Sequence, residues 1–313
     1  MYDLIGDIHG HAAELKALLT KMDYREIDGV WQHAERKVIF LGDFVDRGPE
    51  QVETVTIART MVENGQALAV MGNHEFNAVA WATEDPANSG EYLRPHTDKN
   101  RGQHRAFLEQ AGEGSEQHQS FIEWFKTLPV YLDLPELRVV HACWHPAFVK
   151  SIEPYIDTEN RLLPTAWEAA ARKGTDAYES IETLLKGLEI PLPGDHHFFD
   201  KGENKRTNIR TEWWRQGKLT YRGLAMVPGD QIDRIPHEPV ASHVLPGYDG
   251  EKPLFVGHYW MQGEPAPLNE HIACLDYSVA GKHDGKLCAY RFDGESSLRK
   301  GKFVWVDGSK VEA

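Results

Sequence analysis

The residues YDLIGDIHG (positions 2–10) place a short apolar run directly before a glycine, an acid and a histidine. An apolar run of this length that ends on glycine is typical of a buried strand followed by a tight turn. The pattern returns in KVIFLGDFVDRG (37–48) and in ALAVMGNHE (67–75). In all three segments, polar residues able to bind a metal ion stand where the strand is expected to end.

The segments between these runs have the apolar spacing of helices. We predict helices over residues 12–22 and 49–64, the second with Pro49 in its first turn. The alternation of strands and helices predicts an α/β domain with a largely parallel sheet. Further apolar runs predict a second sheet, with strands at 137–142, 253–257, 271–275 and 286–292. Residues 84–105 and about 191–250 read as long connections of the kind that form functional rims or lids.

The composition narrows the class of protein. The chain has 313 residues, 41% of them hydrophobic and 26% charged, and a formal net charge of -14. This balance predicts a soluble protein without a membrane span, and the absence of a signal-like start leads us to expect a cytoplasmic one. The negative charge disfavours extended nucleic acid as a partner. Cys143, Cys274 and Cys288 are expected to be buried thiols.

Polar residues at the ends of several predicted strands are expected to meet, because ligands of α/β sheets collect at the carboxyl ends of strands. Two of the later runs, at 137–142 and 253–257, contribute one histidine each. The candidate metal ligands are Asp7, His9, Asp43, Asn73, His141 and His258. This mixed nitrogen and oxygen set without thiolate suits Mn, Fe or Zn. Six ligands fit two ions that share a bridging carboxylate, a type of site that clamps a phosphoryl displacement.

In this order, the segments GDIHG, GDFVDRG, GNHE, the His141 segment and Gly257-His258 resemble the motifs of the calcineurin-like metallophosphoesterases. The resemblance is strongest to the bacterial branch of the PPP-type serine/threonine phosphatases, and residues 274–292 are similar to the family's final hairpin. It implies two mixed β-sheets in a sandwich flanked by helices. It also implies one metallophosphoesterase domain over residues 1–313, with an irregular specificity or lid region at about 191–250.

The resemblance also implies a role for each ligand. Asp7 and His9 would bind the first metal ion, and Asp43 would bridge both ions. The second ion would be held by Asn73, His141 and His258. The ions would be two divalent or transition metal ions, with Mn preferred over Fe or Zn.

Three further residues of the motifs would act on the substrate. His74 would protonate the leaving oxygen and Asp46 would orient it, while the forked guanidinium of Arg47 would hold the phosphoryl group. The reaction would be direct attack of metal-bound hydroxide on phosphorus. His11 and His145 are expected to be structural or rim residues.

Residues 201–214 gather basic side chains in an otherwise acidic chain. Lys201, Lys205, Arg206 and Arg210 precede Trp213 and Trp214. One interpretation is a substrate clamp with a stacking aromatic, in which Arg210 supplies a second phosphate contact; Arg206, Arg222 or Arg234 are alternatives. The other interpretation is a solvated basic loop with both tryptophans packed inward.

The substrate class stays open at this level. The leading hypothesis is a phosphomonoesterase of the serine/threonine protein phosphatase type, and the first alternative is a bis(5'-nucleosyl)-tetraphosphatase acting on dinucleoside polyphosphates. His141 is followed by Ala142 and Cys143 rather than by two glycines, which departs from eukaryotic PPP phosphatases. The absence of a second histidine in GHYW (257–260) favours the PPP-like branch over other metallophosphoesterases. A phosphodiesterase or nuclease fits the acidic balance poorly, and a non-catalytic phospho-ligand binding module would have no use for both His74 and Arg47.

Overall fold

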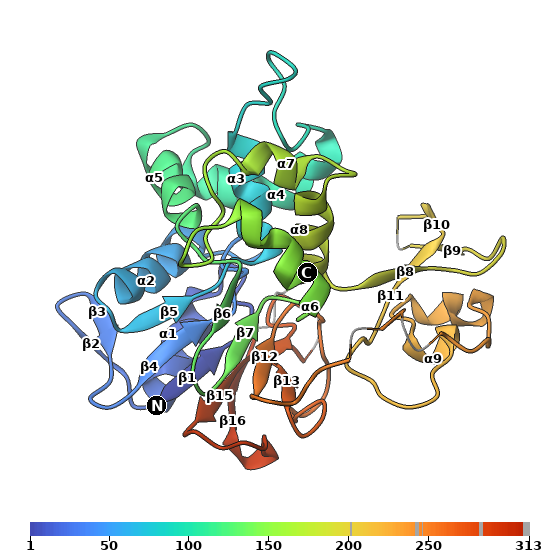
Figure 1. Ribbon diagram of the computed structural model, residues 1–313. Helices are drawn as coiled ribbons and strands as arrows, with labels where there is room; N and C mark the ends of the chain where they lie inside the picture. Colours follow the sequence, from blue (N-terminus) through green and yellow to red (C-terminus); the bar gives the residue numbers. More distant parts are fainter. Residues whose placement is uncertain (201, 242–243, 246, 282–283, 309–313) are drawn as a thin grey trace.

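The computed structural model describes residues 1–200, 202–241, 244–245, 247–281 and 284–308. Two mixed β-sheets lie at its centre, with helices around them (Figure 1). The larger sheet has six strands in the order β14-β15-β1-β4-β5, with β16 paired to β15. Its strands are β1 (Tyr2–Ile5), β4 (Lys37–Phe40), β5 (Ala67–Ala69), β14 (Asp276–Tyr277), β15 (Lys286–Phe292) and β16 (Phe303–Asp307).

The second sheet has four strands in the order β13-β12-β7-β6. They are β6 (Tyr131–Asp133), β7 (Arg138–Val140), β12 (Leu254–Val256) and β13 (Ile272–Cys274). In both sheets the strands next to the site are parallel, and antiparallel strands complete one side of each sheet. A small hairpin, β2 (Arg25–Ile27) with β3 (Val30–Gln32), stands apart from both sheets.

Helices cover the outer faces of the sheets. They are α1 (Ala12–Lys21), α2 (Gln51–Glu63), α3 (Asn73–Ala82), α4 (Asp98–Ala111), α5 (Glu116–Phe125), α6 (Pro146–Ile152), α7 (Trp167–Ala171) and α8 (Asp176–Lys186), with short 3-10 turns η1 (Glu153–Tyr155) and η4 (Lys300–Lys302). Within the described residues, no helix combines the length and apolar character that crossing a bilayer requires.

The alternation of side chains along the strands builds two apolar layers. Leu4 and Ile39 of the larger sheet pack with Val139 and Phe255 of the smaller one in a single buried cluster. Their sequence neighbours point the other way, because successive strand residues face opposite sides of a sheet. Those outward residues join a second cluster that includes the buried faces of the helices. The two sheets therefore form a sandwich between helical layers.

The register of the strands brings their ends to one edge. Ile5 pairs beside Phe40, and Phe40 beside Ala69, so the carboxyl ends of β1, β4 and β5 are level. In the smaller sheet, Val256 pairs beside Cys274 in the same parallel sense. The residues that follow these strands therefore emerge together.

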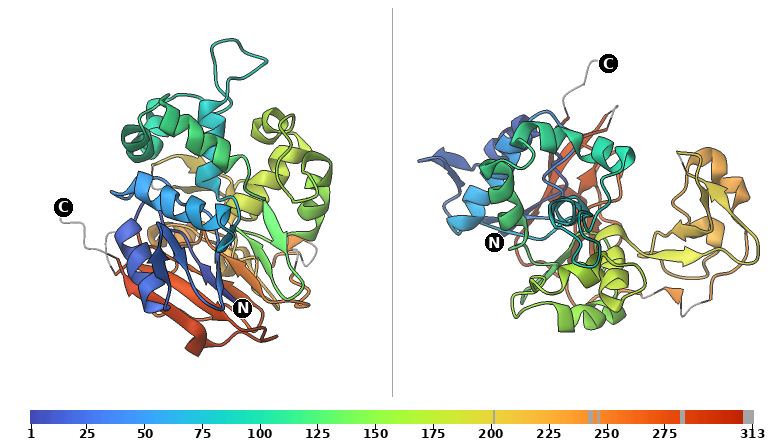
Figure 2. Two further views of the ribbon diagram at one scale, coloured as in Figure 1. Left: turned by 90° about the vertical axis from the view of Figure 1, so that its left-hand side faces the viewer. Right: turned by 90° about the horizontal axis from the view of Figure 1, so that it is seen from above.

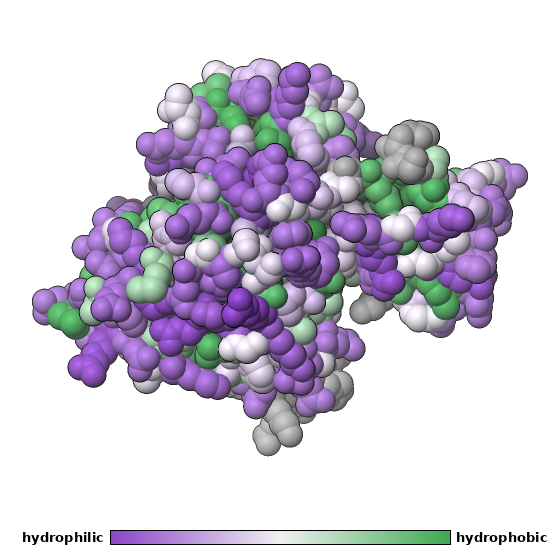
Figure 3. All heavy atoms as spheres, turned by 60° about the horizontal axis from the view of Figure 1, so that its bottom comes forward, coloured by the Kyte–Doolittle hydropathy of each residue, from purple (hydrophilic) through white to green (hydrophobic). Residues whose placement is uncertain are grey.

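A side lobe, residues 189–240, lies beside the main body (Figures 1 and 2). Its elements are β8 (Glu189–Pro191), β9 (Phe198–Phe199), β10 (Lys205–Arg206), β11 (Asn208–Arg210), α9 (Tyr221–Leu224) and the 3-10 turn η2 (Gly229–Arg234). The region expected to be irregular thus contains short hairpins and turns. Figure 3 shows one face of body and lobe that is largely hydrophilic, with apolar side chains in small groups.

Most sequence expectations for the fold are confirmed, including the mixed sandwich, the strands and the buried free cysteines. The position of Pro49 was wrong. Helix α2 begins at Gln51, because Glu50 has a non-helical backbone whose N–H donates to the carbonyl of Gly10 at 2.8 Å. The expectation that residues 84–105 form a connection throughout was also wrong, since α4 begins at Asp98 after the N-cap Thr97, whose hydroxyl accepts from the Asn100 N–H.

Candidate metal centre

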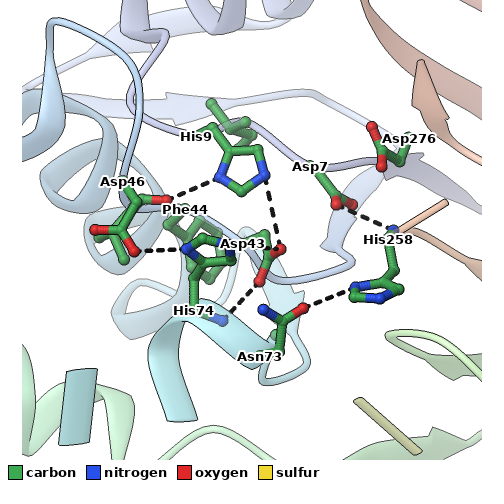
Figure 4. Close-up of polar contacts among 12 residues, drawn as sticks. Asp7, His9, Asp43, Phe44, Asp46, Asn73, His74, His258 and Asp276 are labelled. Atoms are coloured by element: carbon green, nitrogen blue, oxygen red, sulfur yellow. Dashed lines mark hydrogen bonds and ion pairs between the residues drawn. The ribbon is translucent and has the colours of Figure 1, made fainter. Parts of the chain in front are cut away.

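The carboxylate of Asp43 lies at the centre of the site, directly beyond the end of β4 (Figure 4). Its backbone has a φ of 53°, which turns the chain sharply away from the sheet. Oδ1 accepts a hydrogen bond from the backbone N–H of His74 at 2.9 Å. Oδ2 lies 3.3 Å from Nε2 of His141 and 3.7 Å from Nε2 of His9. One oxygen atom therefore faces imidazoles that come from both sheets.

Asp7 and His9 follow β1, and each has one side-chain atom that could bind a metal ion and that makes no hydrogen bond within the described part of the chain. His9 donates its Nδ1–H to the carbonyl of Val45 at 2.9 Å, which leaves Nε2 buried and without a hydrogen-bond partner among the described residues. Asp7 uses Oδ2 to accept the backbone N–H of His258 at 3.0 Å, and its Oδ1 is likewise buried without a partner. Buried polar atoms without partners are costly unless a ligand satisfies them. Both atoms are suited to bind a cation.

Asn73, His141 and His258 form a second group beside Asp43. The Asn73 side-chain oxygen lies 2.7 Å from Nδ1 of His258 and 3.3 Å from Nε2 of His141. His141 donates its Nδ1–H to the carbonyl of Leu41 at 2.7 Å, so its Nε2 faces Asp43 and Asn73. This contact ties the end of β7 to the end of β4. The structure therefore brings together all six side chains that the sequence nominated as metal ligands.

The buried carboxyl and imidazole groups of this site have shifted pKa values that are consistent with cation binding. Burial, reinforced by the nearby carboxylate of Asp276, raises the pKa of Asp7 well above its ordinary value. Although burial opposes the effect, the carboxylates of Asp43 and Asp7 raise the pKa of His141 to about 10. Burial lowers the pKa of His9 to about 3, which keeps this imidazole neutral, as a metal ligand must be. Buried carboxylates beside imidazoles fit divalent metal ions with mixed nitrogen and oxygen ligands, and His141 would give up its proton when it binds such an ion.

A model of the calcineurin-like phosphoesterases matches residues 2–255 of the chain, a span that includes five of these six side chains. The chain belongs to the calcineurin-like phosphoesterase family. The resemblance read from the motifs is thereby confirmed. Members of the family use a dinuclear divalent metal site, and the two groups of donors around Asp43 agree with such a site.

Two similar proteins carry the same name. The asymmetrical bis(5'-nucleosyl)-tetraphosphatase PrpE of Oceanobacillus iheyensis is 30% identical over 141 residues, which are 45% of this chain and 54% of that protein. The protein of that name from Bacillus subtilis is 32% identical over 146 residues, 45% of this chain and 57% of the relative. The chain spans about half the length of the curated relatives it matches.

A solved structure shares the fold. The cold-active protein-tyrosine phosphatase of a psychrophilic Shewanella species superposes with a TM-score of 0.51 at 14% identity, over 93% of this chain and 75% of that chain. This likeness agrees with the mixed sandwich of the calcineurin-like phosphoesterases.

His74 and Asp46 form a close pair beside the candidate metal ligands. Nδ1 of His74 lies 2.5 Å from Oδ2 of Asp46, and Nε2 lies 3.9 Å from Oδ2 of Asp43. Asp46 is 3% exposed. Although burial opposes the effect, His104 and His74 hold its pKa well below the ordinary value. The pair has the geometry of a histidine oriented by an ionised carboxylate, with its second nitrogen turned to the site.

Two arginines stand beside the two groups of donors. Arg47 is exposed, and its guanidinium carbon lies 4.2 Å from the ring centroid of Trp260. Arg210, at the end of β11 in the side lobe, places Nη1 3.0 Å from Nε2 of His258. Of the alternatives to Arg210, Arg206 pairs with Asp200, and Arg222 donates to carbonyl oxygens within the lobe. Arg210 is therefore the lobe arginine for which the structure records a contact with the candidate site.

The clamp interpretation of Trp213 and Trp214 was wrong, because both rings are buried. Trp213 donates its Nε1–H to the hydroxyl of Tyr259 at 2.9 Å. Lys201, a member of the same basic segment, lies outside the described residues. The two tryptophans anchor the lobe and do not present a stacking face.

Sequence reasoning missed three acidic or basic side chains of the site. Glu75 accepts the backbone N–H groups of Asp43, Phe44 and Gly72 at 2.8–3.0 Å and so holds the loop that carries Asp43. Asp276 follows β13 and accepts the backbone N–H of Trp260 at 2.7 Å. The signal for Asp276 was an acid directly after an apolar strand, as at Asp7. The third residue, His104, lies in a helix outside all the motifs.

Proposed function

We propose that this protein is a dinuclear metal-dependent phosphoesterase that hydrolyses a phosphate ester. The observation that carries the proposal is the position of Asp43. Its carboxylate belongs to two sets of donor atoms, each within 4.8 Å, one with His9 and His74 and one with His141 and His258. A carboxylate shared by two cation sites is the arrangement that clamps a phosphoryl group between two ions.

Five residues would complete the two sites around Asp43. Asp7 and His9 would hold the first ion, and Asn73, His141 and His258 the second. When bound, the ions would activate a water and neutralise the charge of the phosphate oxygens. Manganese is the metal we favour, because neutral imidazoles and carboxylates without thiolate suit it.

His74 would supply the proton for the leaving oxygen. Its Nδ1–H is committed to Asp46, so Nε2 is the nitrogen that faces the site. The donor set that contains His74 makes it a candidate ligand as well. We assign it to proton transfer, because its Asp46 contact fixes the ring as general acids require and Asp7 offers an unpaired oxygen in its place. This pair and Arg47 also argue against a non-catalytic binding module.

The phosphoryl group would be held from two sides. Arg47 can donate to phosphate oxygens near His9, and Arg210 can do so near His258. We favour a phosphomonoester of the serine/threonine protein phosphatase type as substrate. Dinucleoside polyphosphates are the second candidate, favoured by the names of the similar proteins and by a second arginine suited to a further phosphate. The side lobe, with Arg210 at its inner end, would form the substrate rim.

The test is phosphate release by metal-stripped protein with and without added manganese, using p-nitrophenyl phosphate. Wild-type protein should gain activity with the metal. Asp43→Asn should lose more than about a hundredfold in kcat/KM and retain less metal, because one oxygen of the shared carboxylate is replaced. Glu109→Gln, an exposed change on α4, is the matched control and should behave as wild type.

Two further comparisons sharpen the result. Normal turnover by Asp43→Asn would refute the shared-carboxylate assignment. His74→Asn should lose rate with little loss of metal, and a clear loss of metal would make His74 a ligand instead. A phosphopeptide compared with a dinucleoside tetraphosphate would then separate the two substrate classes.

A further inference from the structure

His104 lies outside the motifs, yet its side chain reaches the acid–base pair of the site. It belongs to α4, is 2% exposed, and places Nδ1 2.6 Å from Oδ1 of Asp46. The other oxygen of the same carboxylate lies 2.5 Å from Nδ1 of His74. Asp46 therefore stands between two imidazoles, one facing the metal ligands and one embedded in the helical layer.

The chemistry of the three groups determines which atoms carry protons. An ionised carboxylate can only accept hydrogen bonds, so both imidazoles present an N–H at Nδ1. Nε2 of His104 is buried without a hydrogen-bond partner among the described residues. The hydrogen bond to Asp46 is thus the polar contact that the described structure provides for this ring.

Packing holds the His104 ring in place. It lies against Phe107 of the same helix, with ring centroids 5.1 Å apart, and edge-on to Trp81 of α3 at 6.1 Å. A ring fixed in this way fixes the carboxylate it contacts. Without it, Oδ1 of the buried Asp46 would lose its hydrogen-bond donor and the carboxylate could turn away from His74.

We propose that His104 is a positioning residue for phosphoester hydrolysis: it holds Asp46 in the orientation that keeps Nε2–H of His74 directed at the leaving oxygen. The inference rests on the function proposed above. As the bond between phosphorus and the leaving oxygen breaks, that oxygen takes the Nε2 proton of His74. His104 keeps its own proton throughout, so the step needs no further acceptor.

The first test uses two esters that differ in leaving group. p-Nitrophenolate departs readily without a proton, whereas the phenolate of phenyl phosphate is a poorer leaving group and depends more on the acid. His104→Leu should therefore lose about tenfold or more in kcat on phenyl phosphate relative to p-nitrophenyl phosphate. His104→Asn keeps an N–H near the place of Nδ1 and should recover most of that loss.

A neighbouring histidine offers a matched control. His118 of α5 is also buried and packs on Phe107, but its Nδ1 accepts from the backbone N–H of Gly114 at 3.4 Å and does not contact Asp46. His118→Leu should change the two rates by the same factor. If folded His104→Leu, checked by circular dichroism, also lost both activities equally, or if His104→Asn showed no recovery, the positioning role would be refuted.

A second readout does not depend on activity. In metal-free protein, the Nδ1 protons of His74 and His104 should give downfield NMR resonances, assigned with His74→Asn and His104→Leu. His104→Leu should remove one resonance and shift the other, and an unshifted His74 resonance would overturn the inference. Failure of wild-type protein to hydrolyse either ester with any divalent metal would instead overturn the proposed function.

Discussion

At the residue scale, Arg47 shows how an exposed side chain can be held ready for a substrate. Its guanidinium stacks on Trp260, which is 37% exposed and lies two residues after His258. A cation over an aromatic face is stabilised modestly at an exposed site. This contact does not use the N–H donors of the guanidinium group. The donors of Arg47 therefore stay available for phosphate oxygens.

Trp260→Ala should weaken the inhibition of hydrolysis by inorganic phosphate by about two- to fivefold, the equivalent of ~0.5–1 kcal/mol for an exposed cation–π contact. The metal content should not change, since the alanine retains the backbone N–H that bonds Asp276. Inhibition constants of the variant and of Trp260→Phe, which keeps a ring, provide the measurement. If the inhibition constant of phosphate were unchanged in Trp260→Ala, the stacking of Arg47 on Trp260 would not contribute to phosphate binding.

At the element scale, glycines at strand ends allow the two sheets to approach each other. Gly257 directly follows β12, and a Cβ at this position would lie 2.1 Å from Oδ1 of Asp7, the oxygen that has no hydrogen-bond partner in the described structure. Its neighbour His258 then reaches back with its backbone N–H to Oδ2 of the same carboxylate. The absence of a side chain at Gly257 is therefore part of the geometry of the candidate metal ligands.

Gly257→Ala should displace Asp7, so that the protein binds less metal and loses most of its metal-dependent activity. Gly102→Ala is a useful contrast, because Gly102 lies within α4 with open space around its Cβ position. That variant should keep its metal and gain up to about 1 kcal/mol of helix stability. Metal analysis and thermal melting distinguish the two, and full metal content in Gly257→Ala would contradict the prediction.

The amphipathic pattern of α4 also explains why its role escaped the sequence. Its buried residues His104, Phe107, Leu108 and Ala111 follow helical spacing, but the rest of the helix is polar. A segment with so few apolar residues resembles a polar connection, and only the helical spacing of its buried residues indicates a helix. The helix is nevertheless the element that carries His104 to Asp46.

At the scale of the whole molecule, a buried ion cluster joins the N-terminal strand β1 to β15, a strand near the other end of the chain. Asp3 of β1 is fully buried and accepts from Arg36 at 2.9 Å and from the Tyr24 hydroxyl at 3.0 Å. Arg291 of β15 lies 3.3 Å from the same carboxylate. The cluster therefore fastens the antiparallel edge of the large sheet to the parallel strands that lead to the site.

Asp3→Ala should lower the free energy of unfolding by about 3–5 kcal/mol, because it removes the buried carboxylate that pairs with both Arg36 and Arg291 and leaves the buried Arg36 only its part-exposed partner Asp293 among the described acidic residues. Urea denaturation measures the change. Glu53→Gln, which removes only the surface partner of Lys16, should cost less than about 1 kcal/mol. Equal midpoints for the two variants would show that the Asp3 cluster does not stabilise the fold in this way.

The sequence by itself determined the strands that lead to the site, their polar ends and therefore the five candidate ligands that meet around Asp43. That was possible because each motif is local: an apolar run ends, and the next two or three residues turn toward the common edge of the sheets. Tertiary structure alone decided the contacts of His104 with Asp46, 58 residues away, and of Arg210 with His258, 48 residues away. It also decided that Trp213 packs inward. These contacts depend on how a helix and a side lobe pack against the sandwich, and no short-range pattern of residues encodes that packing.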